Sequence, residues 1–471
     1  MHSHFKAVYD DPGVEVLHAA AKNGDIEIIE TLVSQGCLVD SRNREGLTPL
    51  MMAALYDEPS AFQMLLQNSA DPSLKDNDGL SALHYAAKGG STSIINNLLS
   101  RGLDIDSRTN AGVTPLMTAA FCDKQSAFQM LIQNGADPSL KADNGSSLLQ
   151  CAVQGGNPSI INNLLSLGLD IDSRDTQGAT PLMFAAAFDK QSAFQVLIEN
   201  GADPSLKNDE GVSLLHCAVQ GGNPSIINKL LLLGLDIDSR TKVPLDRTPL
   251  MGAAANGKQS AFELLIQNGA DPSLKDYCEE NLLHFAAQGG DITIINTLLS
   301  LGLDINSRSL PGETPLMHAA SNGKQNAFEM LIQNGADPFL KDNDGSNLLH
   351  HAANGGNTSI IDKLLSLGLD VNSMSSFGSP LMYAAEWPQQ RAFQMLIQNG
   401  ADPFLKDKDG SSLLHCAAKG GNTSIINELL SLGIQIDSKD LSGKTPLTIA
   451  AEFKHFEAVK FLFSKRACKS V

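Results

Sequence analysis

Apolar residues recur through the chain at the spacing of short amphipathic helices. Leu116, Ala119 and Ala120 lie at positions i, i+3 and i+4, so they share one face of a helix. A turn near Asp123 separates this helix from a second one. The apolar stripe of the second helix consists of Ala127, Phe128, Leu131 and Ile132. The pattern predicts two short helices joined by a turn.

Capping and turn residues mark the ends of both helices. Thr114 has a hydroxyl suited to an N-cap, and Pro115 fits the first helical turn, where its missing N–H costs nothing. Gly135 follows the second helix as a C-cap glycine does. The turn signals Asp137-Pro138 and Asn144-Gly145 then bound a short extended finger. The predicted unit is therefore helix, turn, helix and finger.

This unit repeats along the chain in two alternating types. One type begins with T-P-L or S-P-L, and these segments start at Thr48, Thr114, Thr180, Thr248, Thr314, Ser379 and Thr445. The other type carries L-H about halfway between them, with the histidines at His18, His84, His216, His284, His350 and His415 and with Gln150 as a variant. Members of the first series lie 65 to 68 residues apart. The true unit is therefore about 33 residues long.

Fourteen such units account for nearly all of the chain. They start near positions 14, 46, 79, 112, 145, 178, 211, 246, 279, 312, 345, 377, 410 and 443. We expect one continuous repeat domain over 14–471, preceded by an N-terminal lead over 1–13. The first unit lacks T-P-L and the last ends in several Lys and Arg residues, as expected of terminal units that need a polar outer face.

The repeated motifs resemble those of the ankyrin-repeat family. The family signature T-P-L-H-x-A is divided between the two unit types, and G-A-D follows the second helix at Gly135, Gly201, Gly269, Gly335 and Gly400. The resemblance implies an all-α solenoid of antiparallel helix pairs with short β-hairpin-like fingers. It also implies that the histidine of the L-H units ties neighbouring units together by hydrogen bonds. The ends of the first helices and the fingers would then line a concave face.

The charge of the chain narrows the choice of partner. Lys and Arg total 34 against 52 Asp and Glu, which gives a formal net charge of −18. Nucleic acids are bound by Lys and Arg that displace phosphate counterions, so we expect no nucleic-acid partner. An anionic membrane surface is disfavoured for the same reason. The acidic surface either keeps a long array soluble or matches a basic partner, and both interpretations stay open.

Cysteine usage and hydropathy favour a reducing compartment. The seven Cys form no C-x-x-C pair and no close Cys/His cluster, which disfavours a disulfide framework or a zinc site. The start shows no signal-peptide pattern, and no stretch of about 18 apolar residues predicts a membrane span. We expect a monomeric cytoplasmic protein without membrane insertion, with the nucleus as the alternative location.

No set of residues matches a catalytic, cofactor or metal motif. The repeated histidines have no recurring carboxylate or thiol at ligand spacing, so packing and hydrogen bonding explain them better. The Asp of each Asp-Pro step is expected to cap backbone N–H groups of its own turn. The Gly-Gly pairs lack the Lys-Ser/Thr of a phosphate loop and are expected to end the first helices. The sequence predicts a non-enzymatic protein with no cofactor and no metal.

Large rings alternate with glycines at the ends of the first helices. In the T-P-L units these positions include Tyr56, Phe121, Phe188, Trp387 and Phe453, whereas the L-H units hold glycine. Aromatic residues are enriched among binding hot spots, so we predict that these rings anchor a partner. The alternative is that they pack over small neighbours and stabilise the stack.

Three fingers depart from the regular pattern, at 241–247, 277–280 and 373–379. Insertions confined to one set of loops often mark the binding face of a repeat protein. Arg247 and Tyr277 are therefore further candidate contacts. Drift in exposed loops is the alternative explanation.

These features favour a protein–protein interaction scaffold or adaptor that binds another protein along its concave groove and fingers. Two alternatives stay open. One is an elastic or structural tether, in which the array itself is the function. The other is a regulatory adaptor that recruits an enzyme complex, including a pathogen protein acting in a host cell. The fold alone does not identify the partner.

Overall fold

A computed structural model describes residues 12–469 of the chain. The chain divides into two compact units, one ending at Leu235 and the other beginning at Asp236. The N-terminal lead predicted for 1–13 lies outside the described residues except for its last two positions. The prediction of one continuous domain over 14–471 stays a prediction.

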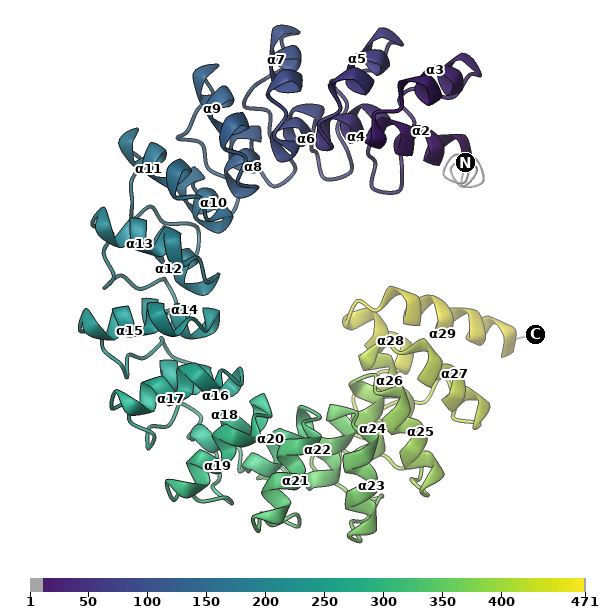
Figure 1. Ribbon diagram of the computed structural model, residues 1–471. Coiled ribbons are helices and arrows are strands. Elements are labelled where there is room, and N and C mark those ends of the chain that lie inside the picture. The colour runs from purple at the N-terminus through teal and green to yellow at the C-terminus, as the bar shows by residue number, and fades with distance from the viewer. Residues whose placement is uncertain (1–11, 470–471) are drawn as a thin grey trace. The chain divides into compact units, whose positions relative to one another are not determined.

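Helices joined by turns make up both units (Figure 1). The first unit contains α2 (Pro12–Asn23), α3 (Ile26–Ser34), α4 (Pro49–Leu55), α5 (Pro59–Gln67), α6 (Ala82–Gly89), α7 (Thr92–Ser100), α8 (Pro115–Phe121), α9 (Gln125–Gln133), α10 (Leu148–Gly155), α11 (Pro158–Ser166), α12 (Pro181–Ala187), α13 (Gln191–Glu199), α14 (Leu214–Gly221) and α15 (Pro224–Leu232). The second unit contains α16 (Pro249–Ala255), α17 (Gln259–Gln267), α18 (Leu282–Gly289), α19 (Ile292–Ser300), α20 (Pro315–Ser321), α21 (Gln325–Gln333), α22 (Leu348–Gly355), α23 (Thr358–Ser366), α24 (Pro380–Glu386), α25 (Gln390–Gln398), α26 (Leu413–Gly420), α27 (Thr423–Ser431), α28 (Pro446–Glu452) and α29 (Phe456–Lys469).

The residues predicted to cap the helices do so. The hydroxyl of Thr114 accepts a hydrogen bond from the Met117 N–H at 3.3 Å, and Pro115 opens α8. Helix α10 ends at Gly155, and Gly156 follows in the left-handed conformation with φ 88°. Short helices of seven to nine residues are marginal by themselves. They must therefore be held by their neighbours.

The core of each unit lies between two layers of helices. Within each unit, the even-numbered helices pack against those of adjacent repeats and against the second helix of their own repeat. Leu and Ala of the first helices face Phe, Leu and Ile of the second helices. Phenylalanines of the second helices buried in this way are Phe62, Phe128, Phe194, Phe262, Phe328 and Phe393, and Phe285 of the first helix α18 is buried as well. Other large rings, including Phe121 and Trp387, are exposed.

Glycine allows first helices of adjacent repeats to approach closely. A Cβ atom added to Gly155 would lie 2.3 Å from the carbonyl oxygen of Ala120 and 2.9 Å from that of Phe121. Both oxygens belong to the backbone at the end of α8, so they cannot swing aside. The same position in other L-H repeats, including Gly89 and Gly289, also lies against the carbonyl groups of the preceding first helix. Close packing of the first helices therefore explains why glycine, rather than a large ring, occupies this position in the L-H repeats.

The repeated histidines join adjacent repeats, as the resemblance implied. In the L-H repeat of α6, Nδ1 of His84 accepts from the Ser81 N–H at 3.2 Å, and Nε2 donates to the carbonyl of Val113 at 3.0 Å. Gln150 makes the same two bonds, accepting from Ser147 N–H at 2.7 Å and donating to the carbonyl of Ala179 at 2.8 Å. Corresponding bonds to the next repeat run from His18, His284, His350 and His415.

Burial favours the neutral form of three of these histidines. It lowers the pKa of His84, His284 and His350 from 6.5 to about 4. Desolvation is the largest cause in each case, because a charged imidazole loses its water inside the stack.

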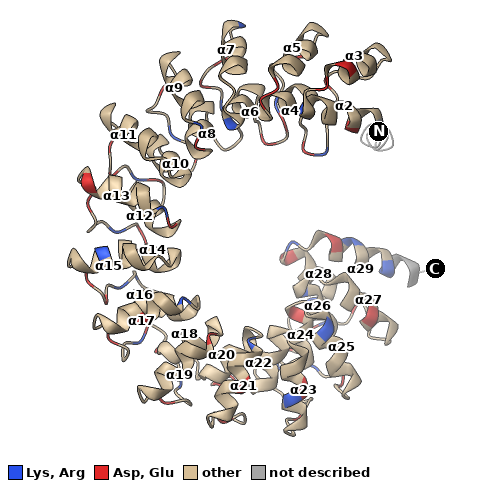
Figure 2. Ribbon diagram, in the orientation of Figure 1, with Lys and Arg blue, Asp and Glu red and all other residues tan. Residues whose placement is uncertain are grey.

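The fingers are short antiparallel turns. Six isolated bridges close them, at Lys75–Ser81, Lys141–Ser147, Lys207–Ser213, Lys341–Asn347, Ser375–Gly378 and Lys406–Ser412, and residues 12–469 contain no longer strand. The Asp-Pro turns are capped as predicted: Asp137 accepts from the backbone N–H of Ser139 at 2.8 Å and from its hydroxyl at 2.6 Å. Charged residues lie mainly in the loops (Figure 2). The predicted all-α array with β-hairpin-like fingers is confirmed.

Candidate functional site

An elongated groove lies between the fingers and the first helices around Phe121. It has a volume of about 740 Å³. The fingers contribute Leu80, Asn110, Ala111, Val113, Ala142, Asp143, Asn144 and Ser146, and the helices contribute Lys88, Met117, Thr118, Phe121, Cys122, Cys151 and Gln154. Apolar side chains thus alternate with a few polar groups, as is usual where proteins bind ligands or peptide segments.

Phe121 is held at the edge of this groove by the repeat itself. It is the last residue of α8, and its side chain is 53% exposed. The backbone beneath it is fixed because Gly155 packs against its carbonyl group. A ring that is half exposed on a fixed backbone can bury more surface on a partner with little loss of backbone freedom.

Trp387 lies in a second, smaller hollow of about 240 Å³. This hollow is lined by Phe377, Tyr383, Glu386, Trp387 and Lys419. Trp387 is the residue that follows α24, and its side chain is 54% exposed. Lys419 and Glu386 form an ion pair of 2.6 Å at the rim. The irregular finger 373–379 reaches this hollow through Phe377.

The other three predicted rings also follow first helices and are exposed. Tyr56 follows α4, with the Lys22 ammonium 4.8 Å from its ring centre. Phe188 follows α12 and packs against Phe184 at 5.9 Å between ring centres. Phe453 follows α28, 5.6 Å from the Lys419 ammonium. Their role in binding stays a prediction.

The two finger residues differ in their surroundings. Tyr277 is exposed at the tip of its finger. Arg247 instead packs within the fold, because its guanidinium lies 4.8 Å from the ring centre of Phe285 and 3.9 Å from the Asp276 carboxylate. These contacts favour a structural contribution of Arg247 next to any binding role, and its role as a contact stays a prediction.

Two cysteines in the Phe121 groove are unsuited to nucleophilic chemistry. Burial raises the pKa of the Cys151 thiol to about 11 and also raises that of Cys122. Both side chains are therefore thiols near neutral pH, whereas the thiolate is the reactive form. They act as small apolar lining.

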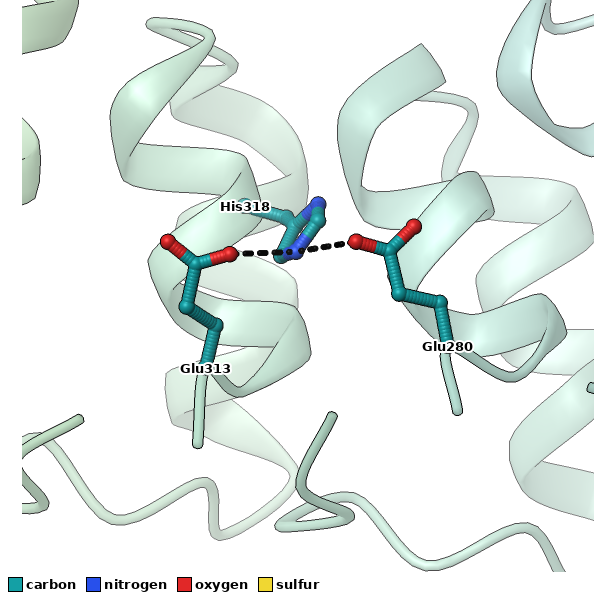
Figure 3. A group of neighbouring side chains, drawn as sticks. All are labelled: Glu280, Glu313 and His318. Atoms are coloured by element: carbon teal, nitrogen blue, oxygen red, sulfur yellow. Dashed lines mark ion pairs between the residues drawn. The ribbon is translucent and has the colours of Figure 1, made fainter. Parts of the chain in front are cut away.

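A cluster of carboxylates and histidines lies beside Arg247 in the second unit. His318 of α20 points between Glu280 and Glu313, and its Nε2 is 3.5 Å from Glu280 Oε1 and 3.3 Å from Glu313 Oε2 (Figure 3). Burial raises the pKa of Glu280, while contact with His318 lowers that of Glu313. His351 of α22 faces the same Glu313 from the next repeat, with Nδ1 3.9 Å from Oε1.

The sequence reasoning missed this cluster because it treated the histidines only as a repeated set. His318 and His351 occupy the position held in other repeats by Thr118, Phe184 or Tyr85. A comparison of this variable position across all repeats would have found both histidines. The same comparison for the variable residue before the N-cap of each first helix would have found the two glutamates.

Two exposed phenylalanines were missed as well. Phe339 and Phe404 stand in the A-D-P-F-L turns where earlier repeats have A-D-P-S-L, and both are exposed. The backbone of the turn is unchanged, since the Phe339 N–H still donates to Asp337 at 2.9 Å. The replacement of Ser by Phe in these turns was visible in the sequence and indicated an additional apolar surface in the second unit.

Comparison with known proteins identifies the repeat. The family described as ankyrin repeats, in three-copy form, matches overlapping stretches that together span nearly the whole chain: 2–76, 57–142, 126–208, 148–241, 192–276, 215–309, 283–375, 316–407 and 381–471. The chain belongs to the ankyrin-repeat family. Ankyrin repeats are generally protein–protein interaction modules, which agrees with the absence of catalytic motifs in the sequence.

Relatives of this ankyrin-repeat chain are otherwise diverse. Serine/threonine-protein kinase 12 of Arabidopsis thaliana is 33% identical over 18% of this chain and 18% of the kinase. Mouse NF-kappa-B inhibitor delta is 36% identical over 15% of this chain and 23% of the inhibitor. A Drosophila melanogaster transient receptor potential channel of subfamily A is 39% identical over 15% of this chain and 6% of the channel. The chain therefore spans less than a quarter of the length of each of these relatives.

A solved structure shares the repeat at lower overall similarity. The match to the human ASB11 ankyrin repeat domain has 26% sequence identity and a TM-score of 0.38. It covers 46% of this chain and 97% of the ASB11 domain. Over residues 12–469, no helix combines the length and the apolar character needed to cross a bilayer.

Proposed function

We propose that this chain is a scaffold or adaptor that captures an extended or helical segment of another protein against its first helices and fingers. The observation that carries the proposal is the Phe121 groove, an apolar cleft of about 740 Å³ with a half-exposed ring on fixed backbone. The family supports the same general role, since ankyrin repeats commonly bind proteins.

The distribution of exposed rings supports a surface with several anchors. Tyr56, Phe121 and Phe188 lie at the C-terminal ends of first helices of successive T-P-L repeats, 65 to 67 residues apart in the first unit. A partner segment that follows the array meets one ring per pair of repeats. Interfaces are stabilised mainly by a few such anchors, surrounded by contacts that exclude water.

Removing the rings should weaken capture while the array stays folded. We expect the fourfold variant Tyr56→Ala, Phe121→Ala, Phe188→Ala and Trp387→Ala to bind its partner at least tenfold more weakly, because each anchor contributes roughly 1–2 kcal/mol or more. The measurement is the dissociation constant for a partner captured by the wild-type chain and then purified. Circular dichroism checks that the helices are retained.

The chain offers a matched control on its other helix layer. Leu167, Leu233, Leu301 and Leu432 follow second helices, and each is likewise partly exposed. Their fourfold replacement by alanine removes a similar apolar surface away from the groove and should leave the affinity unchanged. Equal losses in the two variants would argue for a non-specific apolar contribution, and an unaffected ring variant would contradict the proposal.

A further inference from the structure

The cluster around His318 lies where two variable positions of the repeat meet. Glu280 and Glu313 are the residues just before the N-caps of α18 and α20, 33 residues apart. His318 and His351 occupy the same position of α20 and α22, also 33 residues apart. Repetition of the fold therefore brings an acidic side chain and an imidazole together twice in succession, within the second unit.

Two of the distances in the first group are close to those between ligands of one tetrahedral zinc ion. Ligand atoms 2.0–2.1 Å from a tetrahedral zinc ion are about 3.4 Å apart. Nε2 of His318 lies 3.5 Å from Glu280 Oε1 and 3.3 Å from Glu313 Oε2. The ligand atoms of the three residues all lie within 4.8 Å of one another (Figure 3).

The imidazole nitrogen between the carboxylates lies at ion-pair distance from both but forms no well-directed hydrogen bond with either. Nε2 of His318 is buried, and among the residues that the structure describes it makes no hydrogen bond of normal geometry. The side chains of His318 and Glu280 are each 13% exposed. Buried polar nitrogens are nearly always satisfied, so this atom points to a ligand between the two oxygens.

A second histidine lies near Glu313 but is held by partners of its own. Oε2 of Glu313 faces His318, while Oε1 lies 3.9 Å from Nδ1 of His351. That Nδ1 is 3.1 Å from the hydroxyl of Ser321, and Nε2 of His351 is 3.2 Å from Asp342. The His351–Asp342 pair corresponds to Tyr85–Asp76 in the first unit, so it is a structural pair of the repeat.

We propose that Glu280, Glu313 and His318 bind one zinc ion, with water as the fourth ligand. One imidazole with two carboxylates is a ligand set that suits zinc. Calcium requires six to eight oxygen ligands, and magnesium requires octahedral oxygen coordination. The ion joins the repeats that start near 279 and 312.

The chain itself supplies substitutions that the fold accepts at these positions. Phe184 occupies the position of His318, Ser346 that of Glu280, and Tyr85 that of His351. His318→Phe and Glu280→Ser therefore remove proposed ligands, and His351→Tyr changes the neighbouring histidine that is no ligand, while all three keep residues that the repeat already uses. His84→Gln removes a histidine far along the sequence from the cluster and serves as the control.

Zinc titration of the full metal-free chain, followed by calorimetry, tests the site. We expect one zinc ion per wild-type, His84→Gln or His351→Tyr chain, and no one-site binding in His318→Phe or Glu280→Ser. Zinc should also raise the unfolding midpoint of the wild type and not that of His318→Phe.

Cobalt(II) spectra supply a second readout, since the chain has free cysteines that could bind metal elsewhere. The expected spectrum is that of nitrogen and oxygen ligands without a thiolate charge-transfer band. The proposal is overturned by a wild-type chain that takes up no zinc, by one-site binding that survives either His318→Phe or Glu280→Ser, or by thiolate ligation of the bound ion.

Discussion

Replacing Gly155 by alanine should destabilise the first unit by about 1–3 kcal/mol, despite the better helix propensity of alanine. The added methyl group would lie 2.3 Å from the carbonyl oxygen of Ala120. Because that oxygen belongs to the backbone of α8, relief requires the two first helices to separate. The separation would also expose apolar core between them. Urea unfolding followed by circular dichroism, with hydrogen exchange of α10, measures the loss.

Gly252 provides the opposite case within the same kind of element. It lies inside α16, and a Cβ atom added there would meet nothing within 4 Å. Gly252→Ala should therefore stabilise the second unit by about 0.5–1 kcal/mol, the usual gain for alanine in a helix. If both substitutions changed stability in the same direction, close approach of first helices would not be the reason for glycine at 155.

The second large effect concerns pH. On acidification, the free energy of unfolding of His84→Gln should fall by up to about 3 kcal/mol less than that of the wild type. The reason is that the buried imidazole has a pKa of about 4, against 6.5 in the unfolded chain. Desolvation is the main cause of this shift, with smaller effects from the Val113 carbonyl, Lys75 and Asp76. Glutamine does not titrate, and Gln150 shows that it forms both hydrogen bonds of this position.

The direction follows from proton binding in the two states. Between pH 6.5 and 4 the unfolded chain protonates His84 while the folded chain does not, so acid favours unfolding. The folded state therefore loses no stability to protonation of His84 above pH 6.5, and it loses progressively more as the pH drops toward 4. Hydrogen exchange protection of α6 at pH 5 and pH 8 should differ less in His84→Gln than in the wild type. An unchanged difference between the two pH values would show that His84 does not control it.

The repeat made much of this fold predictable. Helix α8 begins at a Thr-Pro step, whereas α10 begins at a Ser-Leu step and ends at glycine, and these signals act within one turn of chain. The buried stripe Ala127, Phe128 and Leu131 was likewise visible from spacing alone, although Ile132 is only partly buried. Local rules sufficed because each repeat contacts mainly its neighbours.

Contacts between side chains of different repeats were less predictable from the sequence. The contact of Glu280 with His318 joins residues 38 positions apart and depends on the stagger of adjacent repeats. The packing of Arg247 over Phe285 depends on the same stagger. The exposure of the predicted binding rings followed from their place at the ends of first helices. The groove at Phe121 was not predictable in this way, because it also depends on where the fingers lie.

Site-directed photo-cross-linking tests the proposed binding surface most directly. A photoreactive phenylalanine analogue would replace Phe121 or Trp387 in one set of chains, and Leu167 or Leu301 in the control set, followed by irradiation in native cells. The account predicts that one and the same partner protein is cross-linked from Phe121 or Trp387 and is absent from the controls. Cross-linking of that partner from Leu167 and Leu301 alone would place the interface on the second helices and contradict the account.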